Sequence, residues 1–522
     1  MVINTKLCFL LFLLSFFFLS TTLSLAEGEL DKEDQDQDNR RDLQRQYQEC
    51  QQRCQRQDPR QQHQCQRRCQ EQSERGRGGD LLNSHRRDPR GYEEEEEEEE
   101  QRDNPYYFDE RSFTTKFRTE EGHVSLLESF SRRSELLRAL ENYCLELVEA
   151  NPNAFVLPKH LDAEAIFLVV QGRGVINMVR HHNKESYTVN YGDVIRVPAG
   201  TTFYLVNRDN NERLRIAKFL FTESTPGHFR EYFPAGAQNP ESYLRTFSKE
   251  ILQAALNTRT ERIHKVLGQQ REGVIIRATH DQIKELTRHA SGSESRHWPI
   301  GRGSGHESRG PYNLFNRKSH ISYSNNYGQS YEVRPEDYRE LQNMDVSVCI
   351  TNISQGSMMG PFFNTKSTKV VVVDSGEGYV EMACPHLSRR RGGRGGRHEE
   401  EEDVHYQLIR SRLSPRSTIV VPAGHPVVFV AFGNENLQLF AFGINAQDNH
   451  ENFLAGKERN VLQQIESQAL ELAFAAPRKE VEQLLNSQDE SVFFPGPRQQ
   501  QHQSKDSTTK QALPSILDFV GF

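Results

Sequence analysis

A cysteine and two histidines late in the chain carry side chains that bind transition metals. Cys384 and His386 lie two residues apart in the stretch GYVEMACPHLS, and His425 follows a Pro-Ala-Gly turn in VVPAGHPVV. The first stretch has a β-strand pattern, and alternate strand residues share a face, so we expect Cys384 and His386 on one face. One thiolate and two imidazoles are good ligands for zinc or copper. The set is therefore either an enzyme's metal centre or a less reactive arrangement.

The overall composition bounds what the protein can be. The chain has 522 residues, which is enough for two to four domains, and 35% of them are hydrophobic. The formal net charge of -8 gives no general attraction for nucleic acid or for an anionic membrane.

The first 26 residues are predicted to be a secretory signal peptide. They contain Lys6, a Leu/Phe-rich run, and the small residues Ser24 and Ala26 before the expected cleavage point. The alternative is a membrane anchor, but the apolar run is short, no charged stop follows it, and no later run is long enough to span a bilayer. The mature protein is thus expected to be free of the membrane and to pass through an oxidising lumen, where disulfides persist.

Residues 27–104 are rich in Gln, Arg and Glu and have few large apolar side chains. Two C-x3-C pairs predict a helical hairpin at about residues 45–72, because a spacing of four puts both cysteines on one helix face. Disulfides Cys50–Cys69 and Cys54–Cys65 would satisfy that geometry, and a zinc site is the alternative. The run Glu93–Glu100 is predicted to be a solvated acidic linker, because like charges repel.

The rest of the chain is an internal repeat of two all-β units. GVINMV at Gly174 matches GYVEMA at Gly378, and the Pro-Ala-Gly turn ending at Gly200 matches the one ending at Gly424. An Arg/Gly/Glu-rich insertion in the second copy predicts an exposed loop. The expected units are a barrel with a helical arm at 105–265, a linker at 266–310, a second barrel with an arm at 311–495, the exposed loop at 388–403, and a tail at 496–522.

Each predicted arm has one apolar stripe at helical spacing. The first stripe contains Leu244 and Ile251, the second contains Ile465 and Leu472, and Pro477 interrupts the second. These stripes need a surface to cover them, either the parent barrel or a neighbouring subunit. Head-to-tail contacts between unlike arms would close a ring of three protomers.

The repeated motif carries a family resemblance. The spacing G-x5-P-x-G at Gly192–Gly200, its weaker copy at Arg416–Gly424, and Asn207 resemble the second sequence motif of cupins. Together with the signal peptide, the cysteine pairs, the Glu run and the NPYYF segment, the chain resembles the seed vicilins, or 7S globulins. That resemblance implies tandem cupin barrels of the jelly-roll type in a homotrimer, stored in seed protein storage vacuoles and hydrolysed for the seedling. It also implies food allergy, with IgE of sensitised people as a partner.

The ligand set of enzymatic cupins is incomplete in both copies. Family members that are enzymes use two His and one Glu from the first motif and one His from the second. The first copy keeps His160 and Glu164, but Pro158 and Phe203 replace the two other histidines. In the second copy the segment NTKSTK has none of these ligands, and Val427 replaces the later His. We therefore expect a storage protein and no enzyme.

The vicilin resemblance also bears on the opening residues. Some vicilins bind copper in the C-terminal barrel through a Cys-His-His set like Cys384, His386 and His425, with Tyr106 as a possible neighbour. The N-terminal barrel has Arg180, His182 and Thr201 at the matching positions and cannot reproduce this set. Zinc is the competing metal, and a buried thiol beside two hydrogen-bonded histidines is the metal-free alternative. A copper-dependent cupin with redox activity is the alternative function.

Three other sequence features are weaker. Asn352-Ile353-Ser354 is an acceptor sequence for N-glycosylation, although it also fits within a strand. The segment near Ser293 superficially resembles a nucleophile elbow but lies in a polar linker without a preceding strand, which argues against a hydrolase. Cys144 and Cys349 have no assigned role.

Overall fold

The computed structural model describes residues 104–180, 183–292, 310–315, 321–387 and 405–497. These residues belong to one compact unit, Glu96–Phe522. The predicted signal peptide, the cysteine hairpin with its two disulfides, the acidic linker, the exposed loop and most of the tail lie outside the described residues. Those predictions stay untested by the structure.

The N-terminal barrel consists of two sheets that enclose an apolar interior, and their strands are antiparallel except for β14, which pairs with β8 in parallel. One sheet has the order β15-β9-β6-β11-β4-β3-β2, and the other has the order β12-β5-β10-β7-β8-β14, with β13 paired to β5. The elements of this half are β2 (Phe113–Thr119), β3 (Gly122–Leu127), α4 (Phe130–Arg133), η2 (Glu135–Leu140), β4 (Tyr143–Ala150), β5 (Ala154–Leu161), β6 (Ala163–Gln171), β7 (Arg173–Arg180), β8 (Asn183–Asn190), β9 (Asp193–Val197), β10 (Thr202–Asn207), β11 (Leu214–Thr222), β12 (Glu231–Tyr232), β13 (Ile275–Arg277) and β14 (Ser291–Gly292).

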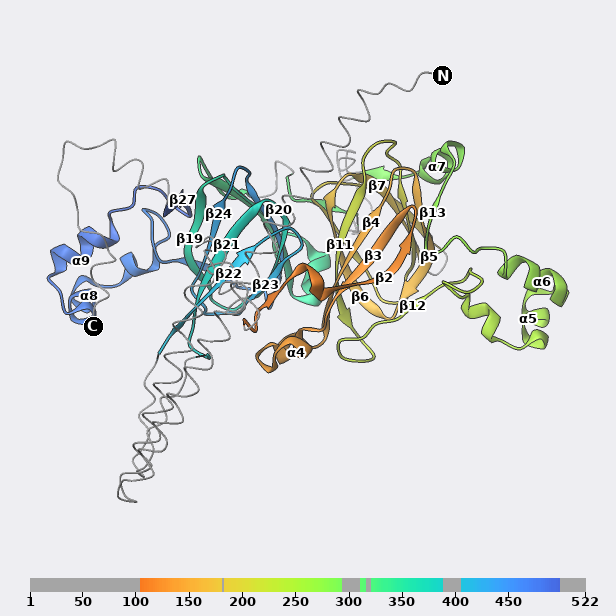
Figure 1. Ribbon diagram of the computed structural model, residues 1–522, viewed down its shortest axis with the longest axis horizontal. Helices are drawn as coiled ribbons and strands as arrows, with labels where there is room; N and C mark the ends of the chain where they lie inside the picture. The colour runs from red at the N-terminus through yellow and green to blue at the C-terminus, as the bar shows by residue number, and fades with distance from the viewer. Residues whose placement is uncertain (1–103, 181–182, 293–309, 316–320, 388–404, 498–522) are drawn as a thin grey trace, which may run out of the picture. The chain divides into compact units, whose positions relative to one another are not determined.

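The C-terminal barrel repeats this architecture. Its sheets have the orders β1-β23-β20-β25-β18-β17-β16 and β22-β21-β24-β19-β26, with β27 paired to β19. The elements are β16 (Ile321–Asn325), β17 (Gly328–Val333), η5 (Arg339–Met344), β18 (Val346–Ile353), β19 (Ser357–Asn364), β20 (Thr368–Ser375), β21 (Glu377–Cys384), β22 (Gln407–Leu413), β23 (Thr418–Val421), β24 (Val427–Phe432), β25 (Leu437–Ile444), β26 (Glu451–Phe453) and β27 (Phe493–Pro495). Figure 1 shows the strands of both barrels.

The internal repeat found in the sequence is confirmed by backbone geometry. Gly192 has a φ of 81° and its N–H donates to the carbonyl of Val169. Arg416, at the matching position of the second copy, has a φ of 70° and its N–H donates to the carbonyl of Val373. The left-handed turn is thus retained although its glycine is lost, which is an uncommon conformation for a non-glycine residue.

Two short segments pair with the barrel of the other half. Strand β1 (Tyr107–Phe108), which comes before the first barrel in sequence, pairs with β23 of the C-terminal barrel. Strand β15 (Tyr312–Asn313), at the start of the second half, pairs with β9 of the N-terminal barrel. The expected boundaries at 105 and 311 therefore do not separate the residues of the two barrels in space.

The two barrels pack through matching central strands. The ring of Phe219 on β11 stacks on Phe442 of β25, with centroids 4.8 Å apart. Beside this contact, the guanidinium of Arg215 lies 2.9 Å from the carboxylate of Asp374. Residues of both halves consequently share one buried apolar cluster, whereas the interior of the N-terminal barrel forms its own.

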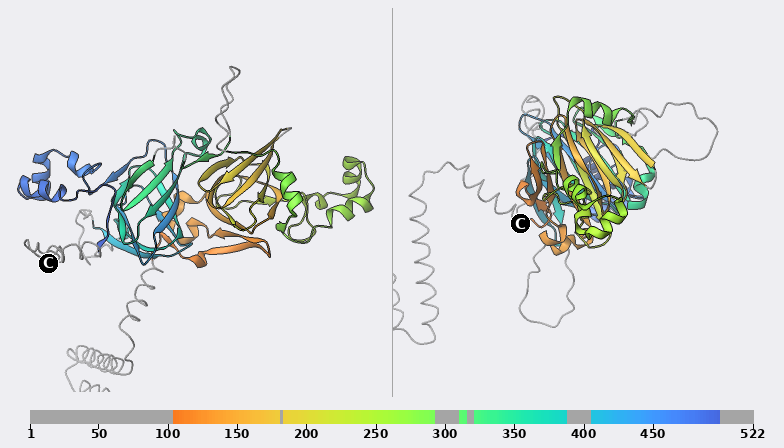
Figure 2. Two further views of the ribbon diagram at one scale, coloured as in Figure 1. Left: turned by 90° about the horizontal axis from the view of Figure 1, so that it is seen from above. Right: turned by 90° about the vertical axis from the view of Figure 1, so that its right-hand side faces the viewer.

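A helical arm follows each barrel, as the apolar stripes predicted. The first arm contains η3 (Tyr243–Thr246), α5 (Lys249–Leu256) and α6 (Thr260–Leu267), and the second contains η6 (Val461–Gln464), α8 (Ser467–Phe474) and α9 (Arg478–Leu485). Figure 2 shows both arms clear of the strands. Pro477, which interrupts the second stripe, is the N-cap residue of α9. Among the described residues, no helix has both the length and the apolar character to cross a membrane.

Helix α7 (His280–Thr287) belongs to the first barrel and covers the outside of one of its sheets. Ile283 and Ala278 pack on Val175 of β7 and Val206 of β10. The helix begins with a capping box, in which Thr279 and Gln282 exchange side-chain and backbone hydrogen bonds.

Candidate metal centre

Strand pairing brings together the two segments that carry Cys384 and His425. Cys384 is the last residue of β21, which pairs with β24 through Met382 and Val427. At the end of this pairing the N–H of Ala383 donates to the carbonyl of Pro426 at 2.9 Å. Both Cys384 and His425 are buried. The prediction that the two segments lie side by side is confirmed.

His386 differs from the sequence expectation. Strand β21 ends at Cys384, and His386 lies in the following turn with an exposed side chain. The expected shared strand face is therefore wrong. Pro385 stands directly after the strand and lacks the N–H that a further ladder bond would need, which accounts for the early end. The imidazole of His386 still approaches that of His425, with ring centroids 5.1 Å apart.

Tyr106 reaches this site because β1 pairs with the C-terminal barrel. The N–H of Val420 donates to the carbonyl of Tyr106 at 2.9 Å, which fixes the backbone of the NPYYF segment against β23. The thiol of Cys384 donates to the Tyr106 hydroxyl at 3.8 Å. Burial, together with this hydrogen bond, raises the pKa of Tyr106. The expected neighbour is thus in contact with the thiol.

The imidazole of His425 presents a nitrogen that could bind copper or zinc. The Nδ1 of His425 lies 3.1 Å from the carbonyl of Ala423, which places the proton on Nδ1 and the lone pair on Nε2. That Nε2 is buried and has no hydrogen-bond partner. Within the described residues, however, no group of three or more His, Cys, Asp and Glu side chains is arranged to hold a metal ion. His386 would have to turn inward to complete the set.

The matching end of the N-terminal barrel has different chemistry. Arg180 ends β7 and lies 3.5 Å from the carboxylate of Glu185, and Thr201 is buried at the position of His425. His182 lies outside the described residues. Arginine and threonine do not supply the thiolate and imidazole of the C-terminal set.

His160 and Glu164 do not face the barrel interior. On β6 the interior residues are Ala163, Ala165 and Phe167, so Glu164 points to the opposite face. There its carboxylate accepts from Arg196 Nε at 2.9 Å. The ring of His160 stacks on Tyr232 with centroids 4.9 Å apart. The expectation that these two residues retain ligand positions is therefore wrong. Neighbouring residues of a strand point to opposite faces, so a difference of one residue in register turns a side chain away from the barrel interior.

The interior of the N-terminal barrel is instead filled by aromatic rings and an ion-pair network. Phe203 packs edge-to-face on Phe167, with centroids 5.4 Å apart. The network joins Glu146 to Lys218 at 2.7 Å and to Lys116 at 3.3 Å, and Glu231 to Lys159 at 2.6 Å and to Lys116 at 3.3 Å. Although burial opposes ionisation, Lys218 and Lys116 lower the pKa of Glu146 to about 2.

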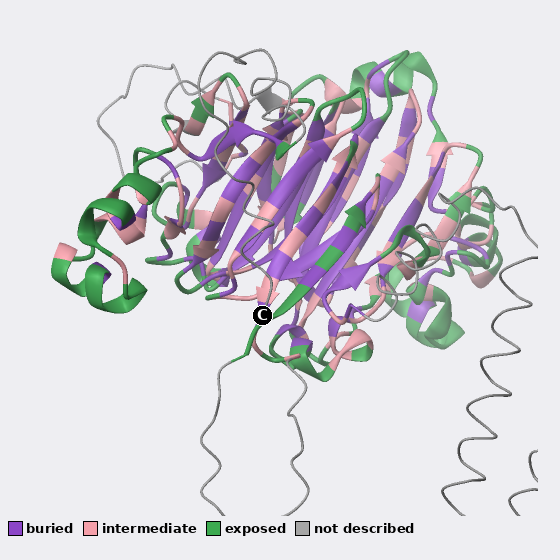
Figure 3. Cartoon of the chain, turned by 60° about the vertical axis from the view of Figure 1, so that its left-hand side comes forward, coloured by how far each residue is buried: buried purple, intermediate pink, exposed green. Residues whose placement is uncertain are grey.

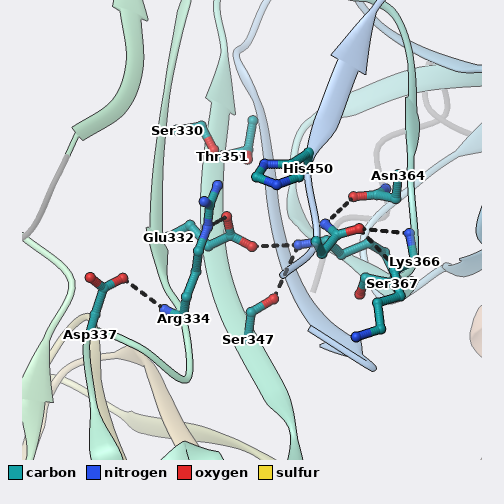
Figure 4. Close-up of polar contacts among 12 residues, drawn as sticks. Ser330, Glu332, Arg334, Asp337, Ser347, Thr351, Asn364, Lys366, Ser367 and His450 are labelled. Atoms are coloured by element: carbon teal, nitrogen blue, oxygen red, sulfur yellow. Dashed lines mark hydrogen bonds and ion pairs between the residues drawn. The ribbon is translucent and has the colours of Figure 1, made fainter. Parts of the chain in front are cut away.

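The C-terminal barrel has a smaller network of the same kind. Figure 4 shows Glu332 of β17 against Arg334. Glu332 accepts from Lys369 Nζ at 2.5 Å and from Arg334 Nε at 2.9 Å. Burial opposes ionisation here too, but Lys369 and then Arg334 lower the pKa of Glu332 to about 2. Sequence reasoning missed both networks, although a charged residue inside an apolar strand, such as Lys218 in RIAKFLF, is a usable signal.

These networks predict loss of stability in acid. A carboxylate with a lower pKa in the folded state stabilises the fold above its unfolded pKa of 4.5, and this contribution disappears as the pH falls toward about 2. We expect the free energy of unfolding to fall by a few kcal/mol between about pH 5 and pH 2. Urea unfolding at a series of pH values measures this, and the Glu332→Gln variant should show a smaller fall than the wild type. If the free energy of unfolding fell equally in both proteins, Glu332 would not contribute to the acid sensitivity.

The other sequence candidates lie in defined places. Asn352 lies near the end of β18, where it pairs with Gln329 and Gln438, and Ser354 of the acceptor sequence follows the strand. Glycosylation there stays a prediction. Cys144 and Cys349 are free thiols, and burial raises the pKa of each to about 12, which keeps both protonated and unreactive.

Known proteins share this fold and much of this sequence. The Cupin family model matches residues 117–264 and 312–482. A Macadamia integrifolia protein named Vicilin-like antimicrobial peptides 2-1 is 70% identical over 454 residues, covering 86% of this chain and 67% of the relative. Vicilin Jug r 6.0101 of Juglans regia is 44% identical over 417 residues, covering 78% and 82%. The crystal structure of vicilin from Corylus avellana has a TM-score of 0.67 and 43% identity, and the match covers 76% of this chain and all of that one.

Proposed function

Because this chain belongs to the vicilins, the 7S globulin bicupins, we propose that it is a seed storage protein that supplies nitrogen and amino acids at germination. One observation carries this proposal beyond the family. In the first barrel Phe203 replaces the second-motif histidine of enzymatic cupins, and the interior around it is occupied by Phe167 and a closed Lys–Glu network. These groups are already paired with one another, which suits a stable reserve better than a reactive centre.

A germination series tests the storage role. Quantitative immunoblots of the intact chain, made from dry seeds through seedling growth, should show its amount falling while free amino acids rise. The control is a metabolic enzyme of the same tissue, whose amount should not fall in parallel. An undiminished amount of the protein in the established seedling would contradict a reserve function. Localisation to the protein storage vacuole, and recognition by IgE of sensitised people, belong to the same proposal.

We further propose that the C-terminal barrel holds one copper ion per protomer through Cys384, His386 and His425, beside Tyr106. Support comes from the thiol contact with Tyr106, the free buried Nε2 of His425, and the closeness of the two imidazoles. Thiolate and imidazole favour copper or zinc over magnesium or calcium. Bound copper would supply one-electron redox chemistry, and the redox enzyme remains the alternative function. In this site the fold buries the Cys384 thiol, and the carbonyl of Ala423 holds the proton of His425 on Nδ1.

The helical arms support a homotrimer. Figure 3 shows mostly exposed residues on the arm helices, in contrast to the buried strands. Large apolar side chains are among them, with Val266 of α6 61% exposed, Leu472 of α8 84% and Leu484 of α9 62%. Apolar stripes of this kind are covered by another surface in stable oligomers. We propose that the arms of neighbouring protomers cover one another in a closed ring.

Light scattering after gel filtration measures the assembly. The wild type should elute with the mass of about three protomers at micromolar concentration. Leu472→Glu should shift the mass toward the monomer, because each buried leucine contributes about 1.5–3 kcal/mol. The matched control is Leu408→Glu, which changes a leucine 63% exposed on strand β22 outside the arms and should leave the mass unchanged. A wild type that is monomeric at this concentration would contradict the proposal.

A further inference from the structure

Both barrels carry a glutamate at the same place in the repeat, but within the described residues only the first of the two forms ion pairs. Glu231 on β12 and Glu451 on β26 each lie on the short strand that pairs with β5 or β19. The carboxylate of Glu231 lies 2.6 Å from Lys159 Nζ and 3.3 Å from Lys116 Nζ. The N-terminal barrel therefore supplies two ammonium groups to this carboxylate.

The C-terminal barrel lacks the first of these ammonium groups. Lys159 stands two residues before Leu161, the strand partner of Glu231, and Phe362 stands two residues before Asn364, the strand partner of Glu451. A phenyl ring thus takes the register position of the lysine. Among the residues that the structure describes, no lysine or arginine nitrogen forms an ion pair with Glu451, while Lys369 and Arg334 are engaged by Glu332. Burial and the nearby Glu332 carboxylate raise the pKa of Glu451, and the charges of Lys369, Arg334 and Arg459 only partly oppose this.

Glu451 lines a cleft that also contains hydrogen-bond donors. The cleft has a volume of about 420 Å³, and its wall includes Tyr323, Arg459 and Asn460. Asn460 is 1% exposed, and its Nδ2 has no hydrogen-bond partner, although its Oδ1 accepts from the N–H of Leu462. The guanidinium of Arg459 lies over the ring of Tyr323, 4.4 Å from its centroid. A buried amide donor without a partner is costly unless another group satisfies it.

We propose that this cleft binds a free α-amino acid. The α-ammonium group pairs with Glu451, in the role that Lys159 has for Glu231, and the α-carboxylate accepts from Asn460 Nδ2 and the Arg459 guanidinium. A plain carboxylate would bring no positive charge to Glu451, and a plain amine would leave the amide donor unsatisfied. Gln464 and Asn452 also line the cleft and can pair with a side-chain amide, so glutamine suits it best. The proposal rests on neither the storage role nor copper.

Isothermal titration of the full-length protein with three matched compounds tests the ligand class. They are L-glutamine, glutaramate, which lacks the α-amino group, and 4-aminobutanamide, which lacks the α-carboxylate. We expect glutamine to bind at least ~10-fold more tightly than either analogue, because each analogue leaves one charged or polar group of the cleft unpaired. Equal affinity for glutamine and glutaramate would overturn the proposal in favour of an anion site. Absence of glutamine binding at millimolar concentration would overturn it altogether.

Two variants assign the site. Glu451→Gln keeps the shape and removes the charge, so glutamine affinity should fall at least ~10-fold while the weak affinity for glutaramate does not fall. The matched control Glu458→Gln changes an exposed carboxylate that does not line the cleft, and glutamine affinity should be unchanged. Circular dichroism establishes that both variants are folded. Wild-type glutamine affinity in folded Glu451→Gln would show that the ammonium does not bind there.

Discussion

The Glu146→Gln variant is expected to unfold with a free energy about 3–5 kcal/mol below that of the wild type. Glu146 is fully buried and is the shared partner of Lys218 and Lys116 inside the N-terminal barrel. Removing its charge leaves the Lys218 ammonium buried without a counter-charge, next to the rings of Phe167 and Phe203. Urea unfolding at pH 7, followed by circular dichroism, measures the change.

An exposed ion pair provides the matched control for this variant. Arg412 and Glu377 lie 3.2 Å apart, and their side chains are 50% and 49% exposed. Water and salt screen such a pair, so Glu377→Gln should cost less than about 1 kcal/mol. If the two glutamine variants were equally stable, burial would not be the reason why the Glu146 network matters.

The Cys384→Ala variant is expected to lose the copper that the wild type retains. The thiolate is the softest donor of the proposed set, and its loss leaves two imidazoles, one of which belongs to an exposed turn. Elemental mass spectrometry after dialysis against a weak chelator should give about one copper per wild-type protomer and close to none in the variant. Bound copper should also raise the melting temperature of the wild type, because only the folded state holds the three ligands together.

Cys144→Ala is the control for the copper measurement. Cys144 is also a buried free cysteine, but its thiol donates to the carbonyl of Gly227 at 3.4 Å and has no histidine partner in the described residues. Its removal should leave the copper content unchanged. Equal copper in wild type and Cys384→Ala would eliminate the proposed site, and zinc in place of copper would change the metal but keep the ligands.

The two-barrel fold could be predicted because its sequence signals lie within short segments and occur once in each half of the chain. The turn at Gly192 recurs at Arg416, and a left-handed backbone is kept at both. The arms were predicted for a similar reason, since an apolar stripe repeats at helical spacing and Pro477 marks a break between helices. In each case a short segment contains the whole signal.

The contacts that shape the candidate site are non-local and could not be predicted in the same way. Tyr107 and Phe108 make a two-residue strand, too short to show alternation, yet their pairing with β23 carries Tyr106 to Cys384. The register of β5 and β6 determines whether the side chains of His160 and Glu164 face the barrel interior, because a shift of one residue moves a side chain to the other face of the sheet. His386 was misplaced because one proline ended β21 two residues earlier than expected.

The most direct test of the storage proposal is a turnover measurement on the purified protein whose metal content has been determined. Superoxide dismutation and the oxidation of a panel of small phenols and organic acids are followed with copper-loaded wild type and with Cys384→Ala. We predict about one copper per wild-type protomer and no difference in rate between the two proteins, both at the level of the buffer. Rapid turnover by the copper-loaded wild type that disappears in Cys384→Ala would contradict the storage proposal and identify a copper-dependent redox enzyme.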